Sequence, residues 1–244
     1  MGVMFKQFFF TAILVATTQA QPDRFGTPAC EAPNQLARRT AFTICFSPEN
    51  RVALWTIYEL LAEHLNAASP RPTHFRRDSD LPDSATNSDY RGSRYQRGHL
   101  VPAADLNWSP EALADSFLLS NAAPQLPRVN LSAMRRVENE IRRTAAASEA
   151  VYVITGTLFD CGTEIAHIGN SHVTVPCAFY KAVLSVKSCI ITAQASIIPN
   201  ESLAIMRTVP VDELERRTGL RFFAPVISPD RPRSQSCLDV LPSF

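Results

Sequence analysis

The segment "YQRGHLVPAAD" (residues 95–105) decides how this sequence is interpreted. It places His99, one of five histidines in the chain, directly behind Arg97-Gly98 and ahead of an apolar run that can form a strand. An isolated histidine is most often a surface or core imidazole with a satisfied hydrogen bond. A catalytic interpretation therefore needs support from other parts of the chain.

The bulk properties indicate one sizeable globular domain. The chain has 244 residues, of which 45% are hydrophobic, and it has no internal repeat or low-complexity run. Its 24 Lys and Arg against 23 Asp and Glu give a formal net charge of +1. Because the bulk charge favours no particular partner, binding of a polyanion has to come from local clusters of basic residues.

The first 20 residues have the pattern of a cleaved secretory signal. Lys6 precedes an apolar run from about Phe8 to Ala16, and small and polar residues follow up to Ala20. This run is shorter than the roughly 20 apolar residues that a membrane span needs. We therefore expect cleavage near Ala20, a secreted or periplasmic location without membrane association, and a single domain over residues 21–244.

The six cysteines include no CxxC pair, which favours structural disulfides over a metal or redox site. Nearness in sequence suggests two pairs, and pairing of a strand with the C-terminal tail suggests the third. The expected pairs are Cys30 with Cys45, Cys161 with Cys177, and Cys189 with Cys237.

Hydrophobic patterns predict a mixed α+β fold. Residues 151–159, 172–186 and 189–200 are typical of strands, and their short connections favour an antiparallel sheet. Residues 51–67 fit either a helix or a strand. Residues 211–220 fit a short helix.

The clearest predicted helix lies in "NLSAMRRVENEIRRTAA" (130–146). Asn130, Glu138 and Arg142 fall within about 80° of one another around its axis. This face offers an amide oxygen, a carboxylate and a guanidinium, a set that suits a hydrated divalent cation beside a phosphate. A solvated face with a Glu138–Arg142 ion pair, or N-glycosylation at Asn130-Leu131-Ser132, explains the same residues without a metal. The predicted apolar stripe consists of Leu131, Met134, Val137 and Ile141.

These segments together resemble the DNA/RNA non-specific endonucleases of the ββα-metal superfamily. That family's signature is Asp-Arg-Gly-His, followed about thirty residues later by a metal-binding Asn. "YQRGHLVPAAD" and "LSNAAPQLPRVNLSAMRRVENEIR" (119–142) are similar to these blocks, and Asn130 lies 31 residues after His99. "VYVITGTLF", "VPCAFYKAVLS", "IIPN" and "VDELERRTGLRFF" follow in the family order, so the resemblance spans about residues 45–225. It implies the ββα-metal nuclease fold, a mixed, mainly antiparallel sheet flanked by helices, here stapled by disulfides.

The resemblance implies a chemical role for four residues. His99 would be the general base that takes a proton from the attacking water, which suits an imidazole with a pKa of about 6.5. Asn130 would be the one direct protein ligand of a Mg²⁺ ion, with Mn²⁺ or another divalent cation as the alternative. Glu138 would hold the water shell of this metal. Arg142 would bind substrate and stabilise the pentacovalent phosphate.

Further residues are expected to support these four. Arg97 would brace the motif or contact substrate, and Asn121 matches a family position near the active site. Arg76 or its neighbour Arg77 is a candidate phosphate contact, with an ordinary solvated surface residue as the alternative.

Two positions depart from the family pattern. Gln96 stands where the family usually has Asp, so a charge that steadies the site is missing, and such losses cost about 10- to 100-fold in activity or metal affinity. Gln keeps a hydrogen-bonding oxygen, which predicts reduced tuning rather than a dead site. Met134 replaces a family Trp, a change typical of core filling.

The expected function is a secreted Mg²⁺-dependent endonuclease that hydrolyses DNA and RNA with little sequence specificity. Substrate would be held through the phosphate backbone, which all sequences share. The alternative is a catalytically weakened or silent exported nucleic-acid-binding protein that retained the fold. The sequence predicts neither an inhibitor protein nor an oligomeric state. The basic residues on or beside the predicted helix are Arg128, Arg135, Arg136, Arg142 and Arg143.

Overall fold

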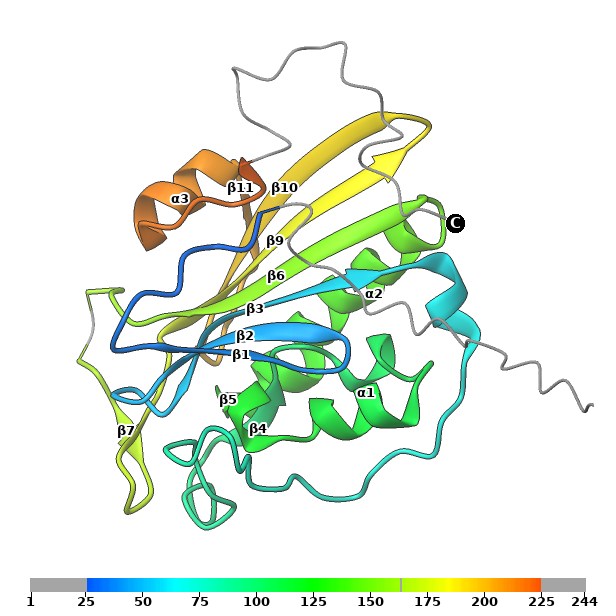
Figure 1. The fold of residues 1–244 in the computed structure, drawn as a ribbon. Helices are drawn as coiled ribbons and strands as arrows, with labels where there is room; N and C mark the ends of the chain where they lie inside the picture. The colour runs from blue at the N-terminus through cyan, green and yellow to red at the C-terminus, as the bar shows by residue number, and fades with distance from the viewer. Residues whose placement is uncertain (1–25, 163, 225–244) are drawn as a thin grey trace, which may run out of the picture.

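The computed structural model describes residues 26–162 and 164–224. A seven-stranded sheet in the order β1-β2-β3-β6-β9-β10-β11 forms its centre, and every neighbouring pair is antiparallel (Figure 1). The strands of this sheet are β1 Gln35–Arg38, β2 Phe42–Ser47, β3 Val52–Leu60, β6 Ala150–Leu158, β9 Ala178–Lys187, β10 Ile190–Pro199 and β11 Arg207–Val209.

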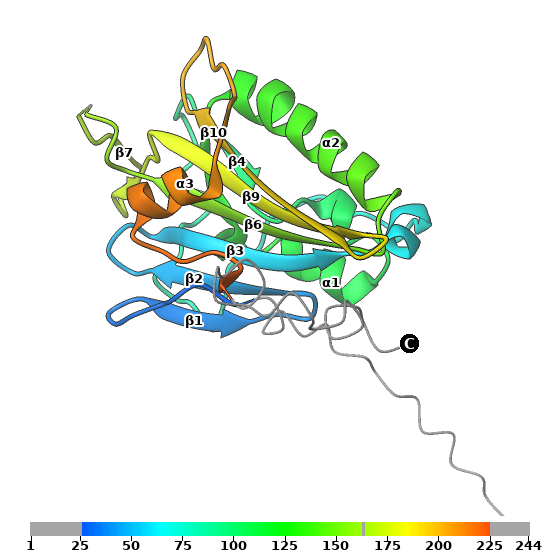
Figure 2. The same cartoon turned by 90° about the horizontal axis from the view of Figure 1, so that it is seen from above.

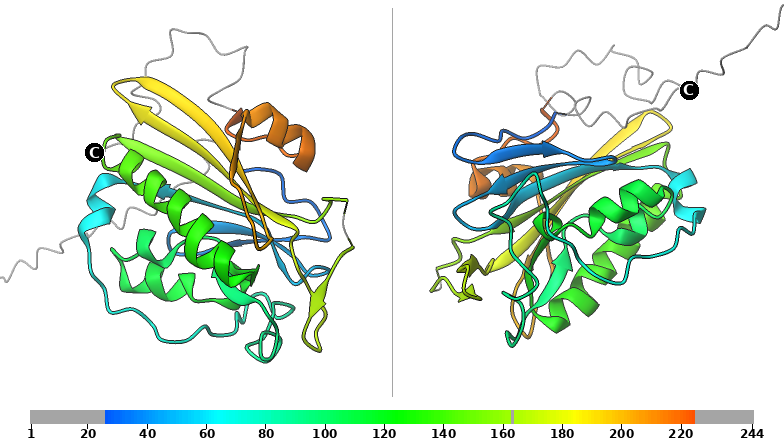
Figure 3. Two further views of the ribbon diagram at one scale, coloured as in Figure 1. Left: turned by 180° about the vertical axis from the view of Figure 1, so that it is seen from behind. Right: turned by 60° about the horizontal axis from the view of Figure 1, so that its bottom comes forward.

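The sheet is covered on both faces. Helix α2 (Arg135–Ala145) runs along one face, and α3 (Val211–Thr218) packs on the other, as the views from the front and from behind show (Figures 1 and 3). Successive residues of a strand point to opposite faces, so β6 contributes Val151 and Val153 to the core under α2. Tyr152 and Ile154 enter the core under α3. Burial on both sides explains why this strand is a nearly continuous apolar run.

A second, two-stranded sheet lies on the same side of the central sheet as α2. It pairs β4 (Gln96–His99) with β5 (Ala122–Gln125), antiparallel. A six-residue π-helix, η5 (Val129–Met134), leads from β5 into α2, so β4, β5 and α2 form the expected ββα unit. Figure 2 shows α2 lying along the sheet. The remaining elements are η2 Ala62–Asn66, η3 Ala103–Asp105, α1 Pro110–Ser116, η4 Leu119–Asn121, β7 His167–Ile168 and β8 Val173–Thr174.

The structure confirms most of the predicted elements. The three predicted strands correspond to β6, to β8 with β9, and to β10, and the C-terminal helix is α3. The ambiguous residues 51–67 form a strand, β3, followed by the short helix η2. In the predicted apolar stripe, Met134, Val137 and Ile141 are buried, but Leu131 is 51% exposed. The expectation for Leu131 is wrong because the wider π-turn rotates the start of the helix relative to α2.

Two of the three expected disulfides are present. Cys30 bonds to Cys45 and Cys161 bonds to Cys177. The third expected pair includes Cys237, which lies outside the described residues, as does the expected cleavage site near Ala20. Among the described residues, none of the helices has the length and apolarity needed to cross a bilayer.

Candidate active site

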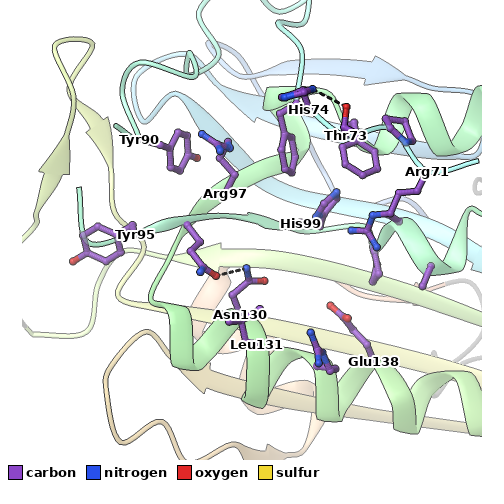
Figure 4. Close-up of a pocket in the computed structure, with 18 of the residues that line it drawn as sticks. Arg71, Thr73, His74, Tyr90, Tyr95, Arg97, His99, Asn130, Leu131 and Glu138 are labelled. Atoms are coloured by element: carbon purple, nitrogen blue, oxygen red, sulfur yellow. Dashed lines mark hydrogen bonds between the residues drawn. The ribbon is translucent and has the colours of Figure 1, made fainter. Parts of the chain in front are cut away.

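A cleft of about 1050 Å³ lies between β4, the loop that precedes it, and the helical segment η5–α2 (Figure 4). Glu138 is the one acidic residue among the described residues that line it. Five arginines outnumber this carboxylate, so the cleft is strongly cationic and suits a polyanion. The five are Arg71, Arg91, Arg97, Arg135 and Arg142.

The pairing of β4 with β5 places His99 at the cleft. His99 lies opposite Ala122 at the end of β4, and Gly98 lies opposite Ala123. The side chain of Gln125 crosses Gly98 so closely that a Cβ on Gly98 would lie 2.0 Å from the Gln125 side chain. Only glycine fits there, which explains the residue directly before His99.

Asn121 holds the backbone that follows His99. Its Oδ1 accepts a hydrogen bond from the Val101 N–H at 3.0 Å, and its Nδ2 donates to the Val101 and Ser116 carbonyls at 3.0 and 2.8 Å. The side chain is fully buried and does not line the cleft. Asn121 is therefore placed to support the site from behind.

The His99 ring is enclosed by two aromatic rings. Its centroid lies 4.6 Å from that of Phe75 and 5.0 Å from that of Phe117. Burial, with a smaller contribution from the positive charge of Arg71, lowers the pKa of His99 to about 3. The ring is therefore neutral at pH 7 and its lone pair is available, but a pKa this far below 6.5 makes it a weaker base than the sequence led us to expect.

Asn130 faces β4 from the first turn of the π-helix η5. Its Nδ2 donates to Gln96 Oε1 at 2.9 Å, and both side chains line the cleft (Figure 4). An amide whose nitrogen is held in this way keeps its oxygen available as a ligand. The neutral Gln96 thus provides the hydrogen-bond acceptor that the sequence led us to expect.

Glu138 extends into the same cleft from α2, on the helical side that carries Asn130 (Figure 4). Burial raises the pKa of Glu138, and the positive charge of Lys181 opposes this shift. Lys181 itself is fully buried on β9, where its Nζ donates to Thr155 Oγ1 at 2.8 Å. Burial lowers the pKa of Lys181, and the negative charges of Glu138 and Asp105 offset only part of this shift.

Arg142 lines the cleft one turn beyond Glu138. Its Nη1 donates to Asp105 Oδ1 at 2.6 Å, and its Nη2 donates to Asn139 Oδ1 at 2.7 Å. The Asp105 carboxylate also accepts a hydrogen bond from the Tyr58 hydroxyl at 2.6 Å. Burial lowers the pKa of Arg142, but Asp105 outweighs this effect and the pKa is raised overall.

Arg97 is held between aromatic rings. Its guanidinium carbon lies 5.6 Å from the ring centroid of Tyr90 and 5.9 Å from that of Phe75. Arg71 lies over Phe117 at 5.3 Å in the same way. Stacking leaves the edges of both guanidinium groups, with their N–H donors, free for phosphate oxygens.

The structure does not bring Arg76 into the cleft. The backbone of Arg76 pairs with Leu118 in an extended conformation, in which successive side chains point to opposite sides. Phe75 packs against His99, so the Arg76 side chain points away from the cleft. Arg76 turns to Asp115, with its Nη2 3.4 Å from Asp115 Oδ1. Arg77 donates to the Pro82 carbonyl and does not line the cleft either. Arg71, and not Arg76, lines the cleft as a candidate phosphate contact.

Five of the other expected site residues meet in one place, and Asn121 supports them from behind. His99, Arg97, Asn130, Glu138 and Arg142 all line the same cleft. Of the basic cluster predicted around the helix, Arg135 and Arg142 reach the cleft, whereas Arg128, Arg136 and Arg143 are exposed outside it.

Several residues of the site were missed in the sequence. Asp105 lies inside the quoted motif, and Lys181 is a single charge within an apolar strand, which is an unusual place for a lysine unless it is paired. Arg71 had no distinguishing signal, because its position depends on a long loop.

The donor set fits a hydrated divalent cation and not a metal held by many side chains. Within the described residues, no three His, Cys, Asp or Glu side chains form a group that could hold a metal. Mg²⁺ gives up its waters reluctantly and is often bound through one or two side chains. Asn130, with its amide nitrogen occupied by Gln96, and Glu138, which has no hydrogen-bond partner among the described residues, match this requirement.

Comparison with known proteins agrees with this geometry. The family described as DNA/RNA non-specific endonuclease matches residues 21–228. The chain belongs to this family. It is therefore a nuclease, in a family of metal-dependent enzymes that act on nucleic acids.

Named relatives cover most of the chain. Human "Endonuclease G, mitochondrial" is 35% identical over 222 residues, covering 84% of this chain and 74% of that protein. "Nuclease 1, mitochondrial" of Schizosaccharomyces pombe is 32% identical over 219 residues, covering 80% and 67%. A crystal structure of an EndoG/EndoGI complex, solved for the mechanism of EndoG inhibition, superposes with a TM-score of 0.75 at 29% identity, covering 84% of this chain and 93% of that chain.

These relatives correct one expectation. Their names describe mitochondrial nucleases from human, cattle and two yeasts, not secreted or periplasmic proteins, so the expected location is wrong. A short apolar run behind one lysine was too general a pattern to define a cellular address.

Proposed function

We propose that this nuclease is a Mg²⁺-dependent endonuclease that hydrolyses the phosphodiester bonds of both DNA and RNA. The observation that carries this proposal is the convergence of His99, Asn130 and Glu138 on one arginine-lined cleft. We further propose that residues 21–244 act as one nuclease domain, which the family match over residues 21–228 supports.

In the proposed reaction, neutral His99 removes a proton from a water molecule. The water oxygen forms a bond to phosphorus, the bond to the 3′ oxygen breaks, and the leaving oxygen takes a proton from solvent. Asn130 Oδ1 would be the direct ligand for the cation, and Glu138 would hold its water shell. A divalent cation held there would supply positive charge that offsets the negative charge developing on the phosphate.

The arginines bind and orient the substrate phosphate. Arg142 stabilises the charge that develops on the pentacovalent phosphate, because its planar fork matches two phosphate oxygens. Arg97 and Arg71, stacked on aromatic rings, hold neighbouring phosphates. Asn121 supports His99 through the Val101 backbone. Contacts of this kind read the backbone and predict little base specificity.

Incubation of supercoiled plasmid and of single-stranded RNA with the protein tests this function. Cleavage of both is expected with Mg²⁺ and none with EDTA. His99→Ala should lower the rate by about 100- to 10,000-fold while the circular dichroism spectrum stays unchanged. His167→Ala, in an exposed position outside the cleft, is the matched control. Cleavage by His99→Ala at the wild-type rate would remove His99 from the mechanism.

A further inference from the structure

Asp105 is a buried carboxylate that no step of the proposed reaction uses. It ends the short helix η3, six residues after His99, and its side chain is fully buried. A carboxylate in such a place is costly unless it is paired and hydrogen-bonded. Both of its oxygens have a partner, because Oδ1 accepts from Arg142 and Oδ2 accepts from Tyr58, each at 2.6 Å.

The contact with Asp105 restrains one guanidinium of the cleft in particular. Among the five arginines that line the described cleft, Arg142 is the one that forms an ion pair with a carboxylate. Its side chain is 22% exposed, so one edge is anchored in the interior while the group still reaches the cleft. Two of its five N–H donors are taken by Asp105 and Asn139, and three remain for substrate.

Tyr58 fixes the carboxylate from the opposite side. It lies on β3, inside the seven-stranded sheet, and its ring is fully buried. Burial raises the pKa of Tyr58 well above its ordinary value, and the negative charge of Asp105 raises it further. The hydroxyl therefore stays protonated and donates to Asp105 throughout the usual pH range. This chain of contacts links the rigid sheet to the guanidinium in the cleft.

We propose that Asp105, held in place by Tyr58, is a positioning residue that orients Arg142 toward the phosphate undergoing cleavage. This inference rests on the proposed function, because it assumes that Arg142 acts on the transition state. A misplacement of about 1 Å of a group that contacts the reacting phosphate can lower the rate about 100-fold. The rigid connection through Tyr58 and Asp105 prevents such a displacement.

The decisive experiment is a double-mutant cycle between Asp105 and Arg142. Asp105→Asn keeps the shape of the side chain and removes its charge, and Arg142→Ala removes the guanidinium. Initial rates on a defined oligonucleotide in Mg²⁺ give kcat and KM for each variant and for the double variant. Asp212→Asn is the matched control, because Asp212 pairs with Arg216 at 2.7 Å on the exposed surface of α3.

Asp105→Asn is expected to lower kcat about 10- to 100-fold with little change in KM, because Arg142 keeps its contact with the bound phosphate but loses its alignment with the transition state. In the Arg142→Ala background the same substitution should cause almost no further loss, because the group that it positions is gone. Tyr58→Phe removes one hydrogen bond and should lower kcat about 5-fold. Asp212→Asn should behave like the wild type.

Two results would overturn the inference while leaving the nuclease proposal intact. One is wild-type kcat in folded Asp105→Asn, and the other is an equal further loss in the Arg142→Ala background, as a general packing defect would give. If Asp105→Asn fails to fold by circular dichroism, Tyr58→Phe takes its place in the cycle and is judged by the same two criteria. If the wild type itself fails to cleave in any divalent cation, the proposed function and this inference both fall.

Discussion

Gln96 accepts a hydrogen bond from Asn130, with 2.9 Å between Gln96 Oε1 and Asn130 Nδ2. The bond connects strand β4, which carries His99, to the π-turn η5, which carries the proposed metal ligand. In this arrangement the Asn130 amide nitrogen faces Gln96 and its oxygen lies free of this contact. The position that departs from the family signature therefore keeps a hydrogen-bonding oxygen and lacks the negative charge of an Asp.

Substitutions at Gln96 should change metal affinity in opposite directions. Gln96→Ala leaves the Asn130 amide free to rotate and should weaken binding of Mn²⁺ about 10- to 100-fold. Gln96→Asp keeps an acceptor and adds a negative charge next to the cation, so binding should become tighter than in the wild type. Manganese titrations followed by electron paramagnetic resonance, without nucleic acid, measure both.

Gln194→Ala, in an exposed position on β10, is the control for the Gln96 substitutions. It should bind Mn²⁺ as the wild type does. Equal Mn²⁺ affinity in Gln96→Ala and wild type would contradict a role for this hydrogen bond in holding the metal ligand.

The neutral state of His99 predicts an unusual titration. With a pKa of about 3, the ring stays neutral down to acidic pH, unlike an exposed histidine. Between pH of about 3 and about 6.5 the unfolded chain binds a proton here that the folded protein does not. The stability contributed by this group is therefore complete above about pH 6.5 and decreases as the pH falls toward 3.

Nuclear magnetic resonance of the imidazole nitrogens tests the titration directly. The His99 ring should show no midpoint near pH 6.5. In His99→Phe, which keeps an aromatic ring between Phe75 and Phe117, the free energy of unfolding should depend less steeply on pH between about 4 and 6. A midpoint near 6.5 for His99 would show that the ring is more hydrated than its packing indicates.

The sequence predicted the fold wherever local pattern and burial agree. β6 is an apolar run because both of its faces are buried, and the run is visible without the structure. Glu138 and Arg142 share a face by regular helical geometry, and Asn130, in the π-turn η5, lines the same cleft. The prediction failed for Leu131, where a π-turn replaces the regular helix on which the periodicity depends.

Residues of the site that depend on long-range contacts could not be predicted in this way. Arg71 reaches the cleft, and Arg76 does not, because one backbone pairing with Leu118 sets which side chains of the loop face His99. Such a pairing leaves no periodic signal in a polar loop. Asp105 and Tyr58 are 47 residues apart, so the pattern around neither one reveals their contact.

Asn121 should contribute strongly to stability. Its side chain makes three buried hydrogen bonds to backbone groups, and removal of the side chain leaves these groups without this partner. Asn121→Ala should lower the free energy of unfolding by about 3 kcal/mol, measured by urea denaturation. Asn170→Ala, in an exposed turn, should have almost no effect. A loss below about 1 kcal/mol for Asn121→Ala would mean that water replaces the amide in the folded protein.

Lys181 should set the pH at which the enzyme loses activity in acid. Glu138 is faced by Lys181, Asp105, Arg142 and Arg135, and the positive charge of Lys181 holds the pKa of Glu138 below the value that burial alone would give. Lys181→Met removes this charge, so Glu138 should take up a proton at higher pH. Protonated Glu138 can no longer act as a negatively charged partner for the metal's water shell, so the acidic limb of the kcat/KM profile should move to higher pH.

The Lys181→Met variant should also be less stable, because Asp105 and Glu138 then lose the buried cation that faces them both. Lys187→Met, at the exposed end of the same strand, is the matched control and should leave both properties unchanged. The pH profile separates the electrostatic role from a packing role, since a packing defect lowers the rate at every pH without moving the acidic limb. A folded Lys181→Met enzyme with an unmoved acidic limb would therefore exclude Lys181 as a group that lowers the pKa of Glu138.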